Sequence, residues 1–270
     1  MKDNDLPDVQ NSQPKINVDI NRVGISDLIL PVFVSKKDNS VQHTIANISC
    51  FVNLDKNLKG INMSRIPIAI HKFIGFPLTG KLIQIIANSI KTKSEANMCQ
   101  LIYKFPYFLQ KLSPISKESG QVLYNVTFDV STDRNIINLS VQTTTTSLCP
   151  CSKEISSGGA HNQKCFINIT CETGIENWIW IEDLIKIAED SSSCEIFSVL
   201  KRSDEKFVTE KAYKNPYFVE DIARNCYEKL DHISKKTGKI GRFIVEVISD
   251  ESIHNHKAFA EITGGKNYEF

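Results

Sequence analysis

The order of apolar and polar stretches limits the fold of this chain most strongly, because the same order occurs twice. Segments 28–34 and 41–54 are rich in β-branched and apolar residues, which predicts two strands. Leu82, Ile86 and Ile90 recur at helical spacing, which predicts a helix beginning after Thr79. The first half thus predicts the order ββααββ, with strands at 28–34 and 41–54, helices at 64–73 and from residue 80, and strands at 99–109 and 121–130.

The second half predicts the same order, with strands at 135–146 and 165–172, helices at 180–190 and 216–236, and strands at 243–248 and 257–262. Asn215 and Pro216 form a helix start signal, and Gly238 is a stop signal. The simplest account is an α+β chain of two tandem units, 26–131 and 132–270, although no identity between the halves is visible. Residues 1–25 are polar and predict an extended arm.

Composition excludes several classes of function. The 270 residues carry a net charge of +1, so no overall positive field attracts nucleic acid. The chain starts without an apolar signal segment, and no stretch reaches the roughly 20 apolar residues of a membrane helix. We therefore expect a cytoplasmic protein that binds neither nucleic acid nor membranes.

Reactive side chains are concentrated between Thr146 and His161. This segment contains Cys149, Cys151 and Lys153 as well as the imidazole of His161. Thiolate and imidazole are ligands of Zn²⁺ or Fe²⁺, and a cysteine beside a lysine can also act as a nucleophile. A structural zinc site needs four protein ligands, whereas a catalytic site needs about three, which Cys149, His161 and one carboxylate would supply. The pattern leaves both chemistries open.

Two further clusters of polar residues, at 201–221 and 251–256, are candidates for function. The charged run 201–210 is most simply a solvated loop. Glu220, in the first turn of the predicted 216–236 helix, could face a ligand or merely complement the helix dipole. Glu251 and His254 are suited to proton transfer, although histidines in surface loops are usually idle.

Several segments of the chain match a known family in the same order, namely 6–10, 23–25, residue 60 with 63–65, 147–156, 160–163, 200–202, 204–206, 208–210 and 251–256. Through these segments the chain resembles type IB GTP cyclohydrolase, a prokaryotic enzyme of folate and pterin synthesis. The resemblance implies the tunnelling fold, in which ββααββ units assemble into β-barrels with helices outside. It implies a homotetramer with active sites at subunit interfaces. The implied reaction is the hydrolysis of GTP to 7,8-dihydroneopterin triphosphate and formate.

The resemblance also implies roles for individual residues. A divalent metal (Zn, Mn or Fe) is implied, without a nicotinamide or flavin. Where the family has histidine in Gly-Ile-His-Met-Ser-Arg, this chain has Asn62, so a contact of that histidine is replaced or absent. The implied roles are metal binding for Cys149, His161 and Glu205, guanine binding for Glu220, acid/base chemistry or substrate contact for Glu251 and His254, a catalytic or supporting role for Cys151, and triphosphate binding for Lys153, Arg65, Lys201 and Arg202.

Two other functions compete with this interpretation. One is the tunnelling-fold nitrile reductase of queuosine synthesis, which uses a nucleophilic cysteine and NADPH, and which Cys194-Glu195 faintly resembles. The other is a non-catalytic assembly protein in which Cys149 and His161 only pin a loop through a metal. A structural site would need none of Glu220, Glu251 and His254, which favours the cyclohydrolase.

Overall fold

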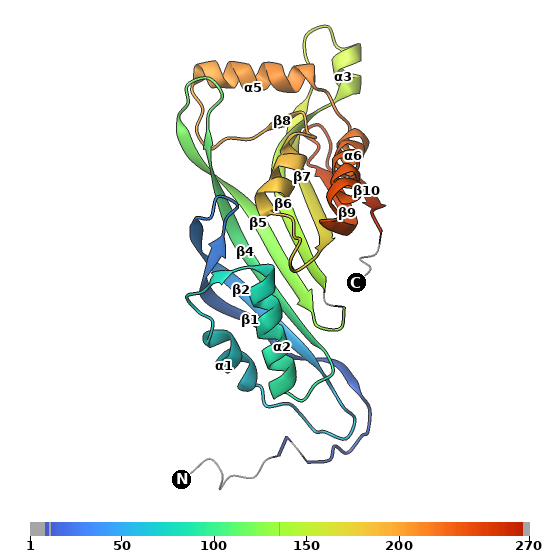
Figure 1. The fold of residues 1–270 in the computed structure, drawn as a ribbon. Coiled ribbons are helices and arrows are strands. Elements are labelled where there is room, and N and C mark those ends of the chain that lie inside the picture. Colours follow the sequence, from blue (N-terminus) through green and yellow to red (C-terminus); the bar gives the residue numbers. More distant parts are fainter. Residues whose placement is uncertain (1–8, 11, 135, 267–270) are drawn as a thin grey trace. The chain divides into compact units, whose positions relative to one another are not determined.

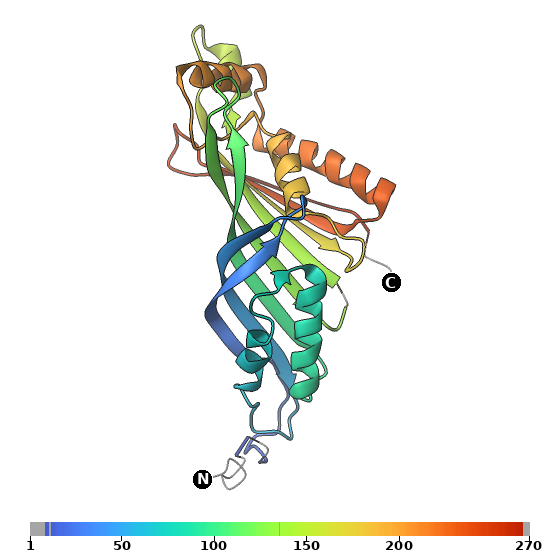
Figure 2. The same cartoon turned by 60° about the vertical axis from the view of Figure 1, so that its left-hand side comes forward.

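The structure is a computed structural model that describes residues 9–10, 12–134 and 136–266. Leu6, Pro7 and Asp8, part of the family resemblance, lie outside the described residues. The chain forms two compact units (Figures 1 and 2). Of the described residues, the first unit contains those up to Ser35, those of His43–Phe105 and those of Phe128–Ile137, and the second contains those of Lys36–Gln42, those of Pro106–Thr127 and those from Asn138 onward. The division into repeated halves, 26–131 and 132–270, stays a prediction.

In the first unit the strands pair in the order β3-β1-β2-β4-β5, and helices α1 and α2 pack on each other. β2 and β4 pair in antiparallel register, with buried Ile48 opposite buried Tyr103. Strands β4 and β5 continue into the second unit. The elements are β1 (Ile20–Ser35), β2 (Val41–Leu54), α1 (Arg65–His71), β3 (Pro77–Leu78), α2 (Gly80–Lys93), β4 (Cys99–Leu112) and β5 (Ser119–Ser131).

The helix predicted after Thr79 is confirmed as α2. The Thr79 hydroxyl accepts a hydrogen bond from the Leu82 N–H at 3.1 Å, which satisfies one free donor at the helix start. Ile86 and Ile90 are buried on its inner face. The first strand, in contrast, begins at Ile20, inside the segment predicted as an arm. The start of this strand was not predicted because it contains polar residues. One of them is Arg22, whose guanidinium lies 4.2 Å from the centre of the Phe51 ring.

In the second unit the strands pair in the order β4-β5-β6-β7-β9-β10, and β8 pairs with β6. Helix α4 packs on β7, and α6 packs on β9 and β10 (Figure 2). The mixed α+β class is therefore confirmed, with a large sheet and few helices. The elements are β6 (Ile136–Leu148), α3 (Pro150–Ile155), β7 (Asn162–Thr173), α4 (Ile181–Glu189), β8 (Cys194–Glu195), α5 (Arg202–Lys214), α6 (Val219–Thr237), β9 (Ile240–Ser249) and β10 (Ala258–Gly264).

The inward face of α6 forms much of the core of this unit. Ile222, Cys226 and Leu230 are fully buried, as their helical spacing predicts. Gly238 ends the helix in the left-handed conformation, with φ of 63°, which glycine adopts without strain. The helix begins at Val219 and not directly after Asn215, so the predicted start was three residues too early. None of the helices in the described ranges is long and apolar enough to cross a membrane.

The prediction that 201–210 forms a solvated loop was wrong, because residues 202–214 form α5. Its narrow inward face consists of Asp204, Val208 and Ala212, at positions i, i+4 and i+8. Ala212 and Val208 pack with Leu148 and Cys194, while Asp204 is buried through hydrogen bonds. Because one residue of the buried stripe is charged, the sequence does not show the apolar residues at helical spacing that would have predicted this helix.

Asp204 ties α5 to the loop before β5. Its carboxylate, fully buried, accepts hydrogen bonds from the Ile115 N–H at 2.7 Å, the Ser116 N–H at 2.9 Å, the Ser116 hydroxyl at 2.5 Å and the Lys201 N–H at 2.9 Å. Burial alone would raise the pKa of Asp204. The hydrogen bonds, that of the Ser116 hydroxyl foremost, outweigh burial and hold this pKa well below its usual range.

We expect Asp204→Asn to lower the midpoint of thermal unfolding by several degrees at pH 7, because the buried network loses its charge-assisted hydrogen bonds. The folded pKa is depressed, so this stabilisation is present above the unfolded pKa of about 4 and is lost as pH falls through the folded pKa. Between pH 7 and pH 2 the difference between the two unfolding midpoints should therefore become smaller. Glu210→Gln, on the exposed side of α5, is the matched control. Equal midpoints for wild type and Asp204→Asn at pH 7 would show that the network does not stabilise the fold.

Candidate functional site

A pocket of about 440 Å³ lies in the second unit, where β6 and β9 end and where β7 and α6 begin. Thiol, imidazole and carboxylate side chains share it with aromatic rings. Its lining consists of Ser147, Cys149, His161, Gln163, Tyr217, Phe218, Val219, Glu220, Ser249, Glu251, His254, His256, Ala258 and Phe259.

Backbone hydrogen bonds hold Cys149 and His161 together. Pro150 starts the short helix α3, and the Cys149 thiol caps it by accepting the Ser152 N–H at 3.4 Å. The Cys149 N–H donates to the His161 carbonyl at 3.1 Å, and the His161 N–H donates to the Ser152 hydroxyl at 3.2 Å. The turn after α3 therefore returns the chain so that residues twelve positions apart become neighbours.

His161 also belongs to a polar network with Gln163 and Glu251. Its Nδ1 lies 2.8 Å from Oε1 of Gln163 and 3.9 Å from Oε2 of Glu251. The side chains of His161 and Glu251 are each 14% exposed, so both are largely shielded yet open to the pocket. An imidazole and a carboxylate in such a setting can exchange protons with a bound ligand.

The donor set of the pocket fits a soft or borderline divalent metal. Cys149 supplies a thiol and His161 an imidazole, the ligands that Zn²⁺ and Fe²⁺ favour. Within the ranges that the structure describes, no three His, Cys, Asp or Glu side chains are grouped to hold a metal. Glu205, the predicted third ligand, is exposed on α5 and does not line the pocket. Two of the three predicted ligands are thus brought together.

The predicted guanine-binding and acid/base residues line the same pocket. Glu220 is exposed in the first turn of α6, where a carboxylate is favourable to the helix dipole. His254 lies in the turn after β9. In this turn the His254 N–H donates a hydrogen bond to the Glu251 carbonyl at 3.3 Å. Its ring stacks on that of His256, with centroids 4.8 Å apart. Cys149, His161, Glu220, Glu251 and His254 therefore face one cavity.

The remaining predicted residues do not line this pocket. Cys151 is exposed on α3, and Arg202 is exposed at the start of α5. Lys153 donates to the Tyr213 carbonyl at 2.5 Å, and its ammonium lies 4.4 Å from the centre of the Tyr213 ring. Lys201 forms an ion pair with Glu118. Each of the three cations is nonetheless on or beside α3 or α5.

Two predicted positions lie in the first unit. The Arg65 guanidinium donates to the Lys93 carbonyl at 2.5 Å and lies 3.9 Å from the Glu95 carboxylate. The Asn62 carbonyl accepts the Arg65 N–H at 3.0 Å, in the turn that leads into α1. The backbone of Asn62 thus serves this turn, whichever side chain the position carries.

Gln163, His256, Phe218 and Phe259 line the pocket but were not predicted as site residues. Gln163 had a usable signal, because residues two apart on a strand share a face and Gln163 follows His161 by two. Phe218 and Phe259 are 41% and 58% exposed. Their position depends on how α6 and β10 meet, which no local pattern in the sequence reveals.

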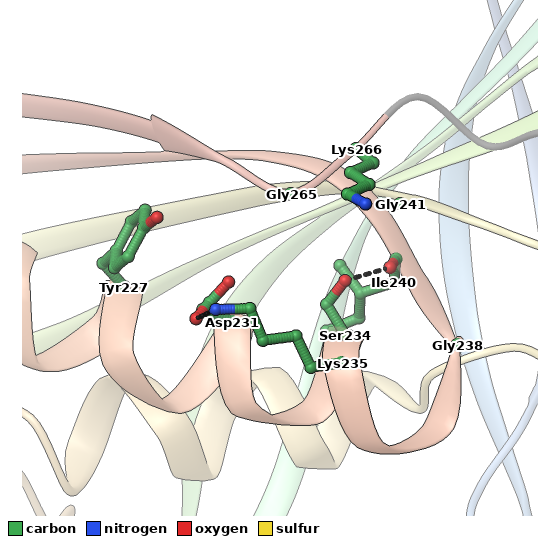
Figure 3. A pocket seen from close by; sticks show the side chains of 9 residues that line it. All are labelled: Tyr227, Asp231, Ser234, Lys235, Gly238, Ile240, Gly241, Gly265 and Lys266. Atoms are coloured by element: carbon green, nitrogen blue, oxygen red, sulfur yellow. Dashed lines mark hydrogen bonds and ion pairs between the residues drawn. The ribbon is translucent and has the colours of Figure 1, made fainter.

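A second pocket, of about 530 Å³, lies between α6, the start of β9 and the residues that follow β10 (Figure 3). Several of its polar groups are paired with each other: Lys235 with Asp231 at 2.7 Å, and the Ser234 hydroxyl with the Ile240 carbonyl at 2.7 Å. Tyr227 and three glycines are among its other lining residues, and none of the described residues that line it carries a thiol or an imidazole. Its chemistry does not match the predicted reaction.

The cysteine that suggested a nitrile reductase is a poor nucleophile. Cys194 is 2% exposed, and burial, with the nearby Glu195 carboxylate, raises the pKa of its thiol to about 12. At neutral pH it is therefore a protonated thiol, which disfavours attack on a nitrile.

Solved structures with the same fold include uricases. A uricase from Bacillus fastidious aligns with a TM-score of 0.55 at 9% identity, covering 91% of this chain and 94% of that one. The uricase from Arthrobacter globiformis aligns with a TM-score of 0.51 at 8% identity, covering 93% and 95%. At such low identity the likeness shows the fold alone, which is the tunnelling fold.

Proteins related in sequence share a much higher identity with this chain than the uricases do. GTP cyclohydrolase FolE2 of Nitrosomonas eutropha is 42% identical over 267 residues, which is 98% of this chain and 97% of that protein. GTP cyclohydrolase FolE2 of Thermotoga maritima is 41% identical over 261 residues, covering 96% and 98%. Residues 6–260 match the family model described as Type I GTP cyclohydrolase folE2. With the pocket of Cys149 and His161 in a tunnelling fold, these matches place the chain in the Type I GTP cyclohydrolase folE2 family.

Proposed function

We propose that this protein hydrolyses GTP to 7,8-dihydroneopterin triphosphate and formate, the first step of folate and pterin synthesis. The observation that carries the proposal is the shared pocket of Cys149, His161, Glu220, Glu251 and His254 in a chain of this family. Family membership disfavours both a nitrile reductase and a non-catalytic assembly protein.

Cys149 and His161 would hold a divalent metal, either Zn, Mn or Fe, with Glu205 as the third ligand. Support for Glu205 comes from α5, whose Val208 packs in the cluster of Leu148, adjacent to Cys149. A metal held there would supply hydroxide at neutral pH for attack on guanine C8. Glu251 and His254 line the same cavity and would carry protons to and from the opening ring.

Glu220 would bind the guanine. Its carboxylate can accept hydrogen bonds from both N1–H and the 2-amino group, whereas adenine presents no such pair of donors. The triphosphate needs cations, and we assign this role to Lys153, Arg65, Lys201 and Arg202 by charge. Cys151, exposed near the Cys149 end of α3, would have a supporting role.

The active enzyme would be a cytoplasmic homotetramer whose units close into β-barrels. Its active sites would lie at the subunit interfaces. Support comes from Phe218 and Phe259, two aromatic residues that line the pocket and are exposed in the single chain. Exposed aromatic rings beside a polar site are typical of a surface that another chain covers. Such a neighbour could also bring further charged groups to the pocket.

The proposal is tested by removing metal with a chelator, reloading the protein separately with Zn²⁺, Mn²⁺ or Fe²⁺, and adding GTP. We expect one formate and one fluorescent pterin, after oxidation, for each GTP consumed. ATP should give neither product. Absence of both products with every metal would refute the proposed activity.

A further inference from the structure

Gln163 connects the groups of the pocket although no role was predicted for it. It is 9% exposed, at the start of β7. Four polar groups surround its amide. They are His161 Nδ1 at 2.8 Å and the Ser252 hydroxyl at 3.5 Å, both from Oε1, and the Ser147 hydroxyl at 3.1 Å and Glu251 Oε1 at 3.4 Å, both from Nε2.

The partners themselves fix which end of the amide faces which group. An ionised carboxylate only accepts hydrogen bonds, so the side facing Glu251 must be the NH₂ group of Gln163. The opposite end, Oε1, therefore faces His161. Because Oε1 can only accept, the imidazole must donate from Nδ1.

We infer that Gln163 is a positioning residue that keeps the proton of His161 on Nδ1 and so reserves the Nε2 lone pair for a ligand in the pocket. In a neutral imidazole one nitrogen carries hydrogen and the other a lone pair, and only the latter can bind a metal. Outer partners of this kind orient metal-binding histidines in other proteins. The consequence for metal binding rests on the proposed function, whereas the position of the proton does not.

The surroundings make Gln163 a rigid and neutral partner. The Ser147 hydroxyl, to which it donates, lies 3.1 Å from the Ser249 hydroxyl, so β6, β7 and β9 all anchor the network. A carboxylate in place of Gln163 would stand beside Glu251 and repel it. An amide supplies the acceptor that His161 needs without adding a second negative charge.

Nitrogen NMR of metal-free protein with ¹⁵N-labelled histidine tests the inference, at a pH where imidazoles are neutral. The signal of His161 among the six histidines is identified by its loss in His161→Asn. In the wild type we expect protonated Nδ1 and unprotonated Nε2. Gln163→Leu removes the acceptor and should shift the proton toward Nε2. Gln163→Glu retains an acceptor and should keep Nδ1 protonated.

Gln84→Leu is the matched control, because Gln84 is buried in α2 of the first unit at 5% exposure, and it should leave the His161 signal unchanged. Competition for Zn²⁺ should show about 10–100-fold weaker binding by Gln163→Leu than by this control. A wild-type His161 protonated on Nε2 would overturn the inference even if Gln163→Leu failed to fold. An unchanged His161 spectrum in folded Gln163→Leu would also overturn it. Neither spectrum depends on GTP turnover, so a failed activity assay would count against the proposed function alone.

Discussion

Cys149→Ser is expected to reduce GTP hydrolysis roughly a thousandfold or more, because it removes the thiolate that would hold the metal. The substitution tests the thiol with little cost to the fold. Serine is a good N-cap residue, so its hydroxyl can take over the hydrogen bond that the Cys149 thiol accepts from the Ser152 N–H. Steady-state formate release and bound metal per chain should fall together.

Cys99→Ser is the matched control for this variant. Cys99 lies in the first unit, where its sulfur is 3.7 Å from that of Cys50, and a hydroxyl can keep a hydrogen bond there. We expect normal metal content and activity. If Cys149→Ser kept both metal and turnover, Cys149 would not be a ligand, even though the chain belongs to the family.

Glu220→Gln is expected to lower kcat/KM for GTP by on the order of a hundredfold or more, because sites built to hydrogen-bond a substrate discriminate by such factors. The change is isosteric, but one oxygen becomes an NH₂ group that would face the donors of guanine. Glu220 is exposed at the helix start, so the fold should tolerate it. Kinetics with GTP and with inosine triphosphate, which lacks the 2-amino group, measure the effect.

The wild type should prefer GTP over inosine triphosphate, and Glu220→Gln should lose most of this preference. Glu228→Gln, an exposed position on the same helix, serves as control and should behave as wild type. A Glu220→Gln enzyme with wild-type kcat/KM and preference would exclude Glu220 as the guanine anchor.

Local patterns predicted those elements whose buried faces are apolar. The Thr79 cap with Ile86 and Ile90 identified α2, and Ile222, Cys226 and Leu230 identified α6, because water exclusion imposes the helical period directly on such residues. Helix α5 was not predicted, because hydrogen bonds hold the charged residue Asp204 in its buried face. A search for apolar residues at helical spacing does not detect such a position.

The candidate site was predictable to a similar degree. Close spacing made Cys149 and His161 neighbours, and the family resemblance added Glu220, Glu251 and His254, all of which line the pocket. The contact between Gln163 and Glu251 depends on how β7 meets the turn after β9. Residues 88 positions apart in the sequence carry no local sign of such a contact.

Absorption spectroscopy of the cobalt-substituted protein tests most directly whether the Cys149 pocket is the metal centre. Co²⁺ bound by a thiolate gives a sulfur-to-metal charge-transfer band, which oxygen and nitrogen ligands alone do not give. We predict this band in the wild type and in Cys99→Ser, and its loss in Cys149→Ser. A band of unchanged intensity in Cys149→Ser would place the metal on another cysteine and contradict the account.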